Sequence, residues 1–478
     1  MLFNSIGYSI FLPVVFLFYW FVTNKNIRLQ NILLLAASYF FYACWDWRFL
    51  FLLMFSTFLD FFTGLKIESS KEQKMKKFWF WLSIIINLGF LGVFKYYNFF
   101  VESFSDFLSH LGFQVNPMTL NIILPVGISF YTFHGLSYVV DIYKEKISAE
   151  RDFVNYSVFV SFFPLLVAGP IERATHLLPQ IKKQRTFDYT KTVDGLRQIL
   201  WGLFKKVVIA DNCAEFANQI FNNAGDYSGS TLLVGAVFFA FQIYGDFSGY
   251  SDIAIGTARL FGIELLRNFS YPYFSRDIAE FWRRWHISLS SWFKDYLYIP
   301  LGGSKGGNWM RIRNTFIIFL VSGFWHGANW TFLAWGAINA FFILPSILLK
   351  TNRNNLDVVA QGCVFPNKKE FLQMMGTFFL TVFAWIFFRS ENINTALQFI
   401  SKICSASIFT IPTIKPFYLF SLIMCFILIE WRGREDAHAL QSFGLSWKKP
   451  FRYALYYTIA FAIFWFGGKE QQFIYFQF

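Results

Sequence analysis

Two histidines lie in apolar, aromatic-rich stretches of the chain, where an ionisable side chain is costly. His326 stands in "FLVSGFWHGANWTFLAWG" (319–336) and His286 in "FWRRWHISLSSWFKDYLYIP" (281–300). An ionisable residue within a membrane span is by default a functional candidate, and imidazole is the usual general base near neutral pH. His326 is therefore the first candidate for a base. The alternative is a packing histidine bonded to an amide or a carbonyl group.

The stretch 319–336 predicts one membrane helix around His326. Gly323 and Gly327 form a small-xxx-small pair, which lets a neighbouring backbone approach closely. On such a helix, four residues share a face with His326: Ser322, Gly323, Asn329 and Trp330.

The stretch 281–300 predicts a second helix, lying at the membrane interface or half buried. Its apolar stripe consists of residues spaced three and four apart: Trp282, Trp285, Leu289, Trp292 and Tyr296. Arg283, Arg284 and Lys294 lie off this stripe, and His286 falls near its edge. The alternative is an aromatic-belt helix whose basic residues contact lipid headgroups.

A third stretch, "FQIYGDFSGYSDIAIG" (241–256), places six polar residues in a hydrophobic context: Gln242, Asp246, Ser248, Tyr250, Ser251 and Asp252. Asp246 and Asp252 point to different faces of a continuous helix, which argues against a paired-carboxylate site. The pattern favours a polar tunnel wall, with capping and hydrogen bonds between helices as the alternative. Three glycines permit a helix break or tight packing: Gly245, Gly249 and Gly256.

Several other chemistries find no support in the sequence. The five cysteines are scattered without a CxxC pair, and two histidines without a third ligand make a poor metal site. No P-loop, dinucleotide fingerprint or GxSxG elbow is present. The remaining interpretation is a histidine base in a water-poor cavity that activates the substrate's own hydroxyl for acyl transfer. We expect no metal and no bound cofactor.

The elements that position these residues are predicted to be membrane helices. Hydrophobic residues make up 55% of the 478 residues and charged residues only 15%, against about 25% charge in soluble proteins. Long apolar runs recur, such as "FWFWLSIIINLGFLGVF" and "TFFLTVFAWIFF", so an all-α polytopic membrane protein of about eleven to thirteen spans is predicted. The first apolar segment lacks a cleavage site and is expected to remain in the mature chain. We expect one integral-membrane domain over residues 1–478.

The net charge of +13 reflects topology rather than a nucleic-acid partner. Basic loops (23–28, 66–77 and "KEKISAER") alternate with non-basic ones ("CWDWR" and 98–117). The positive-inside rule then predicts that the N-terminus and the C-terminal tail lie outside the cytoplasm. The longest polar loop, 350–370, is predicted to be cytoplasmic. Because "SFFPLLVAGPIERATHLLPQ" carries Pro164, Gly169 and Pro170 within an apolar run, it is predicted to be re-entrant and buried in protein or against water.

These stretches resemble one known family. "EFWRRWHISLSSWFKDYLYIPLGGSKGG" and "VSGFWHGANWTFLAWG" are similar to the membrane-bound O-acyltransferases (MBOAT), as are "GISFYTFHGLSYVVDIYK", "FFPLLVAGPIER" and "GDFSGYSDIAIG". The similarity runs over roughly residues 120–400, and the nearest branch is that of bacterial alginate and peptidoglycan O-acetyltransferase membrane subunits. The resemblance implies a ring of about eleven transmembrane helices, with re-entrant and interfacial helices around a central tunnel.

The resemblance also implies roles for single residues. His326 matches the family's catalytic histidine and His286 the second histidine of the bacterial branch. Residues expected to line the substrate tunnel are Gln242, Asp246, Tyr250, Arg283 and Asn329.

The activity implied by the resemblance moves an acyl group, most simply acetyl, to hydroxyls of a polysaccharide or cell-wall polymer outside the cell. The donor would be acetyl-CoA or another acyl thioester on the cytoplasmic side. The expected location is the bacterial cytoplasmic (inner) membrane, and the expected partner is an extracytoplasmic SGNH-hydrolase-like acyltransferase. Two alternatives remain: a D-alanyl transferase of teichoic acid modification, and a non-enzymatic polysaccharide exporter or channel.

The last six residues, "FIYFQF" (473–478), fit a pattern F-x-Y-x-x-F that resembles the C-terminal motif of this family or of its small partner proteins. In that family the tyrosine is proposed to carry the acyl group, which makes Tyr475 a candidate acyl relay. The alternative is an interfacial aromatic anchor at the lipid–water boundary.

Overall fold

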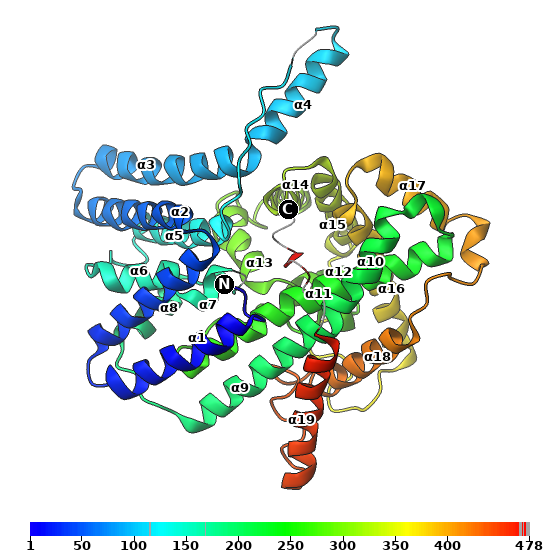
Figure 1. The fold of residues 1–478 in the computed structure, drawn as a ribbon. Helices are drawn as coiled ribbons and strands as arrows, with labels where there is room; N and C mark the ends of the chain where they lie inside the picture. Colours follow the sequence, from blue (N-terminus) through cyan, green and yellow to red (C-terminus); the bar gives the residue numbers. More distant parts are fainter. Residues whose placement is uncertain (114–115, 168, 468–470, 472, 475–478) are drawn as a thin grey trace. The chain divides into compact units, whose positions relative to one another are not determined.

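A computed structural model describes the chain except for residues 114–115, 168, 468–470, 472 and 475–478. Within this described part, the chain forms helices and loops and no strand (Figure 1). The predicted all-α architecture is confirmed. The chain divides into two compact units, residues 1–192 with 258–266 and residues 193–257 with 267–478.

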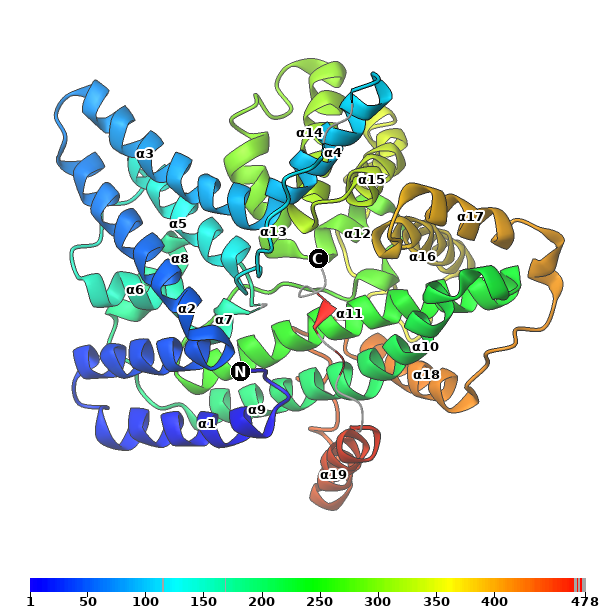
Figure 2. The same ribbon diagram turned by 45° about the horizontal axis from the view of Figure 1, so that its top comes forward.

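The first unit is built around α2, on which α3, α5 and α6 pack. Its helices are α1 Ile6–Leu17, α2 Ile27–Ser69, α3 Gln73–Leu91, α4 Tyr97–His110, α5 Ile128–Tyr143, α6 Phe153–Ser161, α7 Phe163–Leu166 and α8 Ala174–Lys182, with π-helical segments at Phe18–Val22 and Gly92–Tyr96. Figures 1 and 2 both show α2 and α3 side by side. A buried Asp60 joins them by accepting hydrogen bonds from Ser83 Oγ (2.6 Å) and Asn87 Nδ2 (2.7 Å).

Helix α2 is long enough to cross a membrane twice. Its 43 residues correspond to about 65 Å at 1.5 Å per residue, roughly twice a hydrocarbon core of ~30 Å. The helix breaks at Asp46, whose backbone is extended (φ −155°, ψ 111°) and whose carboxylate pairs with Arg48 at 2.6 Å. This break falls in "CWDWR", where the sequence predicted a loop between two spans.

The segment predicted to be re-entrant is interrupted and buried. Helix α6 ends at Ser161, Phe162 leaves the helical conformation, α7 lasts four residues, and α8 begins only at Ala174. The described residues from Ser161 to Ala174 are all buried. Irregular backbone in a membrane protein requires such burial because lipid offers it no hydrogen bonds.

The second unit holds α11, which is mostly buried. Its helices are the greater part of α9 Tyr189–Leu203, then α10 Asp211–Asn222, α11 Gly229–Leu260, α12 Ile278–Arg284, α13 Ile287–Phe293, α14 Gly307–His326, α15 Trp330–Leu348, α16 Lys368–Arg389, α17 Ile393–Ile403, α18 Phe417–Arg432 and α19 Lys449–Phe466. Shorter segments are π-helical (Phe204–Ala210 and Lys294–Tyr298) or 3₁₀ (Ala224–Asp226, Pro272–Phe274 and Ala406–Phe409).

The glycines of α11 serve tight packing rather than a break, since the helix runs unbroken through them. A Cβ atom on Gly249 would lie 2.8 Å from the carbonyl oxygen of Gly202, and one on Gly202 would lie 2.6 Å from that of Gly249. The backbones of α9 and α11 therefore touch at this point. Of the two uses predicted for these glycines, close packing is the one observed.

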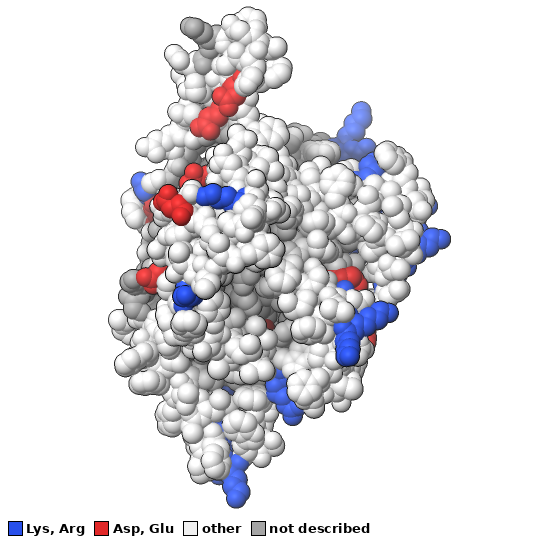
Figure 3. Space-filling model, turned by 90° about the vertical axis from the view of Figure 1, so that its right-hand side faces the viewer, with Lys and Arg blue, Asp and Glu red and all other residues white. Residues whose placement is uncertain are grey.

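Helix length and composition agree with a polytopic membrane protein. Among the described residues, five segments are long and apolar enough to cross a membrane: Ile27–Ser69, Gln73–His110, Gly229–Leu260, Trp330–Leu348 and Lys368–Arg389. A shorter apolar segment covers Ile6–Val22. On the face drawn in Figure 3, charged side chains are few and scattered among uncharged residues, as lipid contact requires.

Candidate active site

The backbone breaks at His326, and the continuous helix predicted over 319–336 is wrong. His326 is the last residue of α14, and Gly327 is extended (φ −161°, ψ 150°). The side chain of Asn329 then caps α15 by accepting a hydrogen bond from Thr331 N at 3.0 Å. Asn329 thus acts as a helix cap, and its Nδ2 donates to the carbonyl of Glu391 at 2.8 Å.

Helices α14 and α15 pack closely just before this break. A Cβ atom on Gly323 would lie 2.2 Å from the carbonyl oxygen of Phe332, and one on Gly336 would lie 2.3 Å from that of Phe319. A Cβ atom on Gly327 would meet the ring of Phe332 at 2.1 Å. The close backbone approach predicted for the small-residue pair is confirmed at Gly323, whereas Gly327 faces a side chain.

A second break lies at His286, so the single helix predicted over 281–300 is also wrong. Helix α12 ends at Arg284 and α13 starts at Ile287, while His286 adopts a left-handed conformation (φ 44°, ψ 54°). Loop carbonyls supply the missing helical bonds, because Ile287 N donates to Asn268 O at 2.9 Å. A histidine held at positive φ is strained, and such strain gathers at functional sites.

The two breaks bring both histidines to one small cavity. His286 and His326 are 1% and 5% exposed, and their ring centroids are 6.5 Å apart. The cavity has a volume of about 110 Å³, and its lining residues are Trp282, Trp285, His286, Leu289, Ser290, Phe293, Ile318, Phe319, Ser322 and His326. Outside the histidines, the polar side-chain groups of these residues are serine hydroxyls and indole N–H groups, so the cavity suits water-poor chemistry.

Aromatic rings fix the imidazole of His326. Its centroid lies 4.8 Å from that of Trp325, 5.3 Å from that of Trp335 and 5.4 Å from that of Phe388. All three pairs are edge-on. The base candidate is thus held by packing on several sides.

Asn268 fixes the imidazole of His286. With Asn268 Nδ2 donating to Ser251 Oγ (3.0 Å), its Oδ1 faces Ser288 Oγ (2.9 Å) and His286 Nδ1 (3.0 Å). An Nδ1–H that donates to this oxygen leaves Nε2 as a hydrogen-bond acceptor. Among the described residues Nε2 has no partner. Burial lowers the pKa of His286 to about 3, so this imidazole is neutral at neutral pH.

The polar residues of α11 meet a segment from the end of the chain. Asp246 Oδ2 accepts a hydrogen bond from Ile474 N at 2.7 Å, and Lys206 Nζ bridges Asp246 Oδ1 and Asp211 Oδ1, each at 2.8 Å. Lys206 also donates to the carbonyl of Gln471 at 3.2 Å. The residues expected to line a tunnel thus include one that binds the chain's own C-terminal segment.

Aromatic contacts join this segment to the histidine cavity. Phe473 is fully buried, with its ring 4.2 Å from Tyr250 and 6.3 Å from Phe247 (centroid to centroid). Phe247 in turn lies edge-on to His286 at 4.6 Å. The relay candidate Tyr475 lies outside the described residues. Gln242 is buried, and its Oε1 accepts no hydrogen bond from any described residue.

Arg283 holds a loop. Its guanidinium donates to the carbonyls of Asn352 and Asn355, both at 2.7 Å. Three more arginines bind carbonyls of this loop: Arg276 and Arg284 at Asp357, and Arg434 at Val359, Ala360 and Cys363. The long polar loop between α15 and α16 is therefore fastened through its backbone, and a tunnel role for Arg283 stays a prediction.

Sequence reasoning missed two of these groups. Asn268 carries no recognisable signal, because it lies 18 residues from His286 and the contact depends on an unusual backbone turn. Lys206 did carry one, since "FKKVVIA" places two lysines inside an apolar run, and charges there mark pairing or function. The described residues contain no cluster of three or more metal-binding side chains.

These features define a polytopic membrane enzyme with a buried histidine pair. The sequence profile of MBOAT, the membrane-bound O-acyltransferase family, matches residues 143–385, which include both histidines. The chain belongs to this family and is an O-acyltransferase. Because the chain belongs to a family of enzymes, the alternative of a non-enzymatic polysaccharide exporter or channel is not supported.

Three relatives refine the comparison. The peptidoglycan O-acetyltransferase of Helicobacter pylori is 35% identical over 98% of this chain and 95% of its own length. The probable alginate O-acetylase AlgI of Pseudomonas aeruginosa is 39% identical over 82% of this chain and 72% of its own. The teichoic acid D-alanyltransferase of Streptococcus thermophilus is 29% identical over 50% of this chain and 61% of its own.

Proposed function

We propose that the protein transfers an acetyl group from a cytoplasmic thioester, acetyl-CoA, to hydroxyls of an extracytoplasmic polysaccharide or cell-wall polymer. The observation that carries this proposal is the pair of buried histidines facing one small, mostly apolar cavity. Greater identity and coverage for the two O-acetyltransferase relatives favour acetyl over D-alanyl transfer.

His326 is the proposed general base. It accepts the proton of the attacking hydroxyl as that oxygen forms a bond to the thioester carbonyl carbon. When the carbon–sulfur bond breaks, the imidazolium returns the proton to the leaving thiol. His286 positions the donor. Because Asn268 leaves Nε2 as an acceptor, His286 can bind an amide N–H of the coenzyme A arm, whereas it cannot donate a hydrogen bond to the thioester carbonyl or to an oxyanion.

Tyr475 is the proposed first acceptor. A phenol has a pKa of about 10, close to the pKa of about 8.5 for a thiol, so the two are leaving groups of similar quality. An acetyl ester of tyrosine therefore stays activated relative to an ester of a sugar hydroxyl. A polymer hydroxyl then attacks that ester and the tyrosine hydroxyl is regenerated. The burial of Phe473 and Ile474 beside the residues that contact His286 supports this role, since a membrane-surface anchor would not need it.

The charges of the loops indicate which parts of the protein face the cytoplasm. The N-terminus and the tail lie outside the cytoplasmic membrane, the thioester is bound inside, and the acetyl group crosses within the protein. An extracytoplasmic SGNH-hydrolase-like partner then catalyses the last step, in which the polymer hydroxyl attacks the tyrosine ester.

The test is polymer acetylation in cells carrying His326→Gln. We expect a loss of about 100- to 10,000-fold, with normal membrane levels. His438→Gln is the matched control, because His438 is equally buried but pairs with Asp194 at 3.1 Å, away from the cavity. An active His326→Gln protein would refute the assignment of the base.

The relay needs its own measurement. Purified protein given acetyl-CoA without acceptor should gain one acetyl group on the C-terminal peptide, and Tyr475→Phe should abolish both this adduct and polymer acetylation. An active Tyr475→Phe protein without adduct would return the tail to the anchor interpretation.

A further inference from the structure

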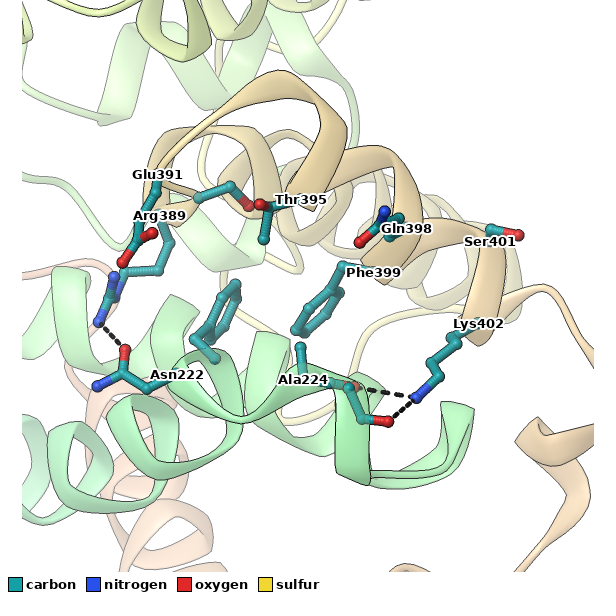
Figure 4. A pocket seen from close by; sticks show the side chains of 12 residues that line it. Asn222, Ala224, Arg389, Glu391, Thr395, Gln398, Phe399, Ser401 and Lys402 are labelled. Carbon is teal, nitrogen blue, oxygen red and sulfur yellow. Dashed lines mark hydrogen bonds between the residues drawn. The ribbon is translucent and has the colours of Figure 1, made fainter.

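A second cavity of about 460 Å³ opens in the second unit, away from the histidines (Figure 4). It lies between α17 and the end of α10 with the following 3₁₀ turn, next to the last residue of α16. Its lining residues are Phe221, Asn222, Ala224, Gly225, Arg389, Ser390, Glu391, Thr395, Gln398, Phe399, Ser401 and Lys402. The cavity is thus larger than the histidine cavity and more polar.

Two cations stand at its two ends, and both are held by neutral acceptors. Arg389 donates to Asn218 Oδ1 (2.8 Å) and Asn222 Oδ1 (3.4 Å). Lys402 donates to the carbonyls of Ala224 (3.2 Å), Gly225 and Tyr227 (3.3 Å).

Neither cation forms an ion pair with any residue that the structure describes. Glu391 also lines the cavity and interacts electrostatically with Arg389, but its carboxylate lies beyond ion-pair distance of both side chains. The neutral acceptors orient both side chains, and the three carbonyls take up all three N–H donors of Lys402. Arg389 keeps further N–H groups that can take a carboxylate from a ligand.

Uncharged polar side chains from α17 also line the cavity. Thr395, Gln398 and Ser401 recur every three residues and follow one another along α17 beside the pocket (Figure 4). The side chains of Gln398 and Ser401 are exposed and make no hydrogen bond to another described residue. They offer donors and acceptors to a ligand with several hydroxyl groups.

Stacked aromatic rings fix the shape of the cavity. Phe221 and Phe399 stack at 4.5 Å with an interplanar angle of 16°, and the Arg389 guanidinium lies 5.6 Å from the Phe221 ring. Both rings are buried. Arg389 is therefore held by a ring and two amides before any ligand binds, which lowers the entropy cost of binding an anion.

We propose that this cavity binds a carboxylated sugar unit of the acceptor polymer. An Arg guanidinium recognises a carboxylate with paired hydrogen bonds, and the row on α17 matches sugar hydroxyls. The proposal rests on the proposed function for its choice of a glycan. In the proposed orientation α16 runs outward from the cytoplasmic loop 350–370, so Arg389 and the cavity lie on the polymer's side of the membrane.

The test measures sugar binding without turnover. Full-length His326→Gln protein in detergent is titrated calorimetrically with trimannuronate and with its carboxyl-reduced, neutral counterpart. We expect trimannuronate to bind at least tenfold more tightly. Arg389→Gln should weaken it about tenfold or more, whereas Arg389→Lys should retain part of the affinity.

The matched control is Lys415→Gln, which removes the same charge from an exposed lysine outside the cavity and should leave binding unchanged. Gln398→Ala is the second variant should Arg389→Gln fail to fold, and a severalfold loss is expected. Absent binding, equal binding of the neutral sugar, or indifference to Arg389 and Gln398 would overturn the proposal. Binding of phosphatidylglycerol instead of the sugar, with the same dependence on Arg389 and Gln398, would also overturn the proposal.

The two proposals fail separately. Cation-dependent sugar binding by a protein that acetylates no polymer would sink the proposed function and leave the site standing. Acetylation that requires His326 but proceeds without this binding would sink the site alone.

Discussion

The Oδ1 atom of Asn268 decides what His286 can do. It lies 3.0 Å from Nδ1 and so leaves Nε2 as an acceptor toward the cavity. Because burial lowers the pKa of His286 to about 3, the ring carries no charge at any pH from about 5 to 9. Its protonation should therefore contribute no step to the pH profile of the wild-type enzyme.

Replacing Asn268 by Asp should create such a step. A carboxylate beside Nδ1 raises the pKa of His286 by about 1 to 3 units, so the ring becomes protonated as the pH falls toward that value. Nε2 is then a donor and the acceptor is lost. We expect acetyl transfer by Asn268→Asp to show an additional decline on the acid side, with a midpoint between about pH 4 and 6, on top of the decline that protonation of the base causes in the wild type.

The measurement is kcat/KM from about pH 4 to 9 for wild type, Asn268→Asp and Ser288→Ala. Ser288 donates to the same Oδ1 atom (2.9 Å) but bears no charge, so its removal should leave the shape of the profile unchanged. Identical profiles for wild type and Asn268→Asp would show that Asn268 does not act through His286.

At the scale of elements, the contact between α14 and α15 sets the position of His326. Gly323→Ala would place a Cβ atom 2.2 Å from the Phe332 carbonyl oxygen, and the helices can only move apart. We expect a destabilisation of about 1–3 kcal/mol, together with reduced transfer, measured by thermal unfolding in detergent and by acetylation.

Gly376→Ala is the control for that variant. Gly376 lies inside α16 with no atom within 4 Å of its Cβ position, so stability should stay the same or rise slightly. Equal effects of both alanines would mean that helix propensity, not the close contact, governs the result.

The C-terminal segment is a second positioned element. Removing the Asp246 carboxylate takes away the acceptor of Ile474 N and one of the two anions on Lys206. We expect Asp246→Ala to release the segment, so that carboxypeptidase digestion, followed by mass spectrometry, removes Phe473 and Ile474, which are buried and should resist digestion in the wild type. Asp246→Asn keeps an acceptor and should protect partially.

Asp252→Ala separates this effect from general loosening of α11. Asp252 pairs with Lys205 at 2.6 Å on the same helix as Asp246 and forms no hydrogen bond or ion pair with the described residues of the segment, so protection should persist. Continued protection in Asp246→Ala would contradict the anchoring role, whatever Tyr475 does.

Helix identities were predictable from the sequence, but the breaks that shape the site were not. The apolar runs predicted where the membrane helices lie, and Gly323 predicted the close packing of α14 against α15. At His286 no glycine or proline marks the turn, since a histidine occupies the left-handed position. Gly327 was interpreted as a packing residue, and a Cβ atom there would indeed meet the Phe332 ring, but nothing in the sequence around it predicted the extended backbone at which α14 ends.

At the scale of the whole molecule, loop charges predict which loops face the cytoplasm. Cys44 lies next to the break at Asp46 and Cys363 lies in the loop between α15 and α16, and both are exposed. In intact cells a membrane-impermeant maleimide should label single-cysteine protein at Cys44 but not at Cys363. After permeabilisation it should label both. Cys213 is buried and should stay unlabelled throughout.

The reverse labelling pattern would invert the topology and place the 460 Å³ cavity on the wrong side for a polymer. It would leave the histidine chemistry intact, because the cavity of His286 and His326 lies within one unit. Topology and chemistry are thus independent claims. The sequence supported the first through loop charge alone, and it supported the second through the two histidines without Asn268 or Lys206.

Because arginines bind the loop between α15 and α16 through its main chain, the amino-acid sequence of the loop can change more freely than its length. Arg276, Arg283, Arg284 and Arg434 bind main-chain oxygens there, and every amino acid supplies such an oxygen. Most side chains of the loop can therefore be exchanged at little cost, whereas its length is constrained. One inserted residue would shift the later carbonyls past their arginines and leave buried guanidinium groups without acceptors. In related chains, the amino acids of this loop should therefore vary far more than the length of the loop.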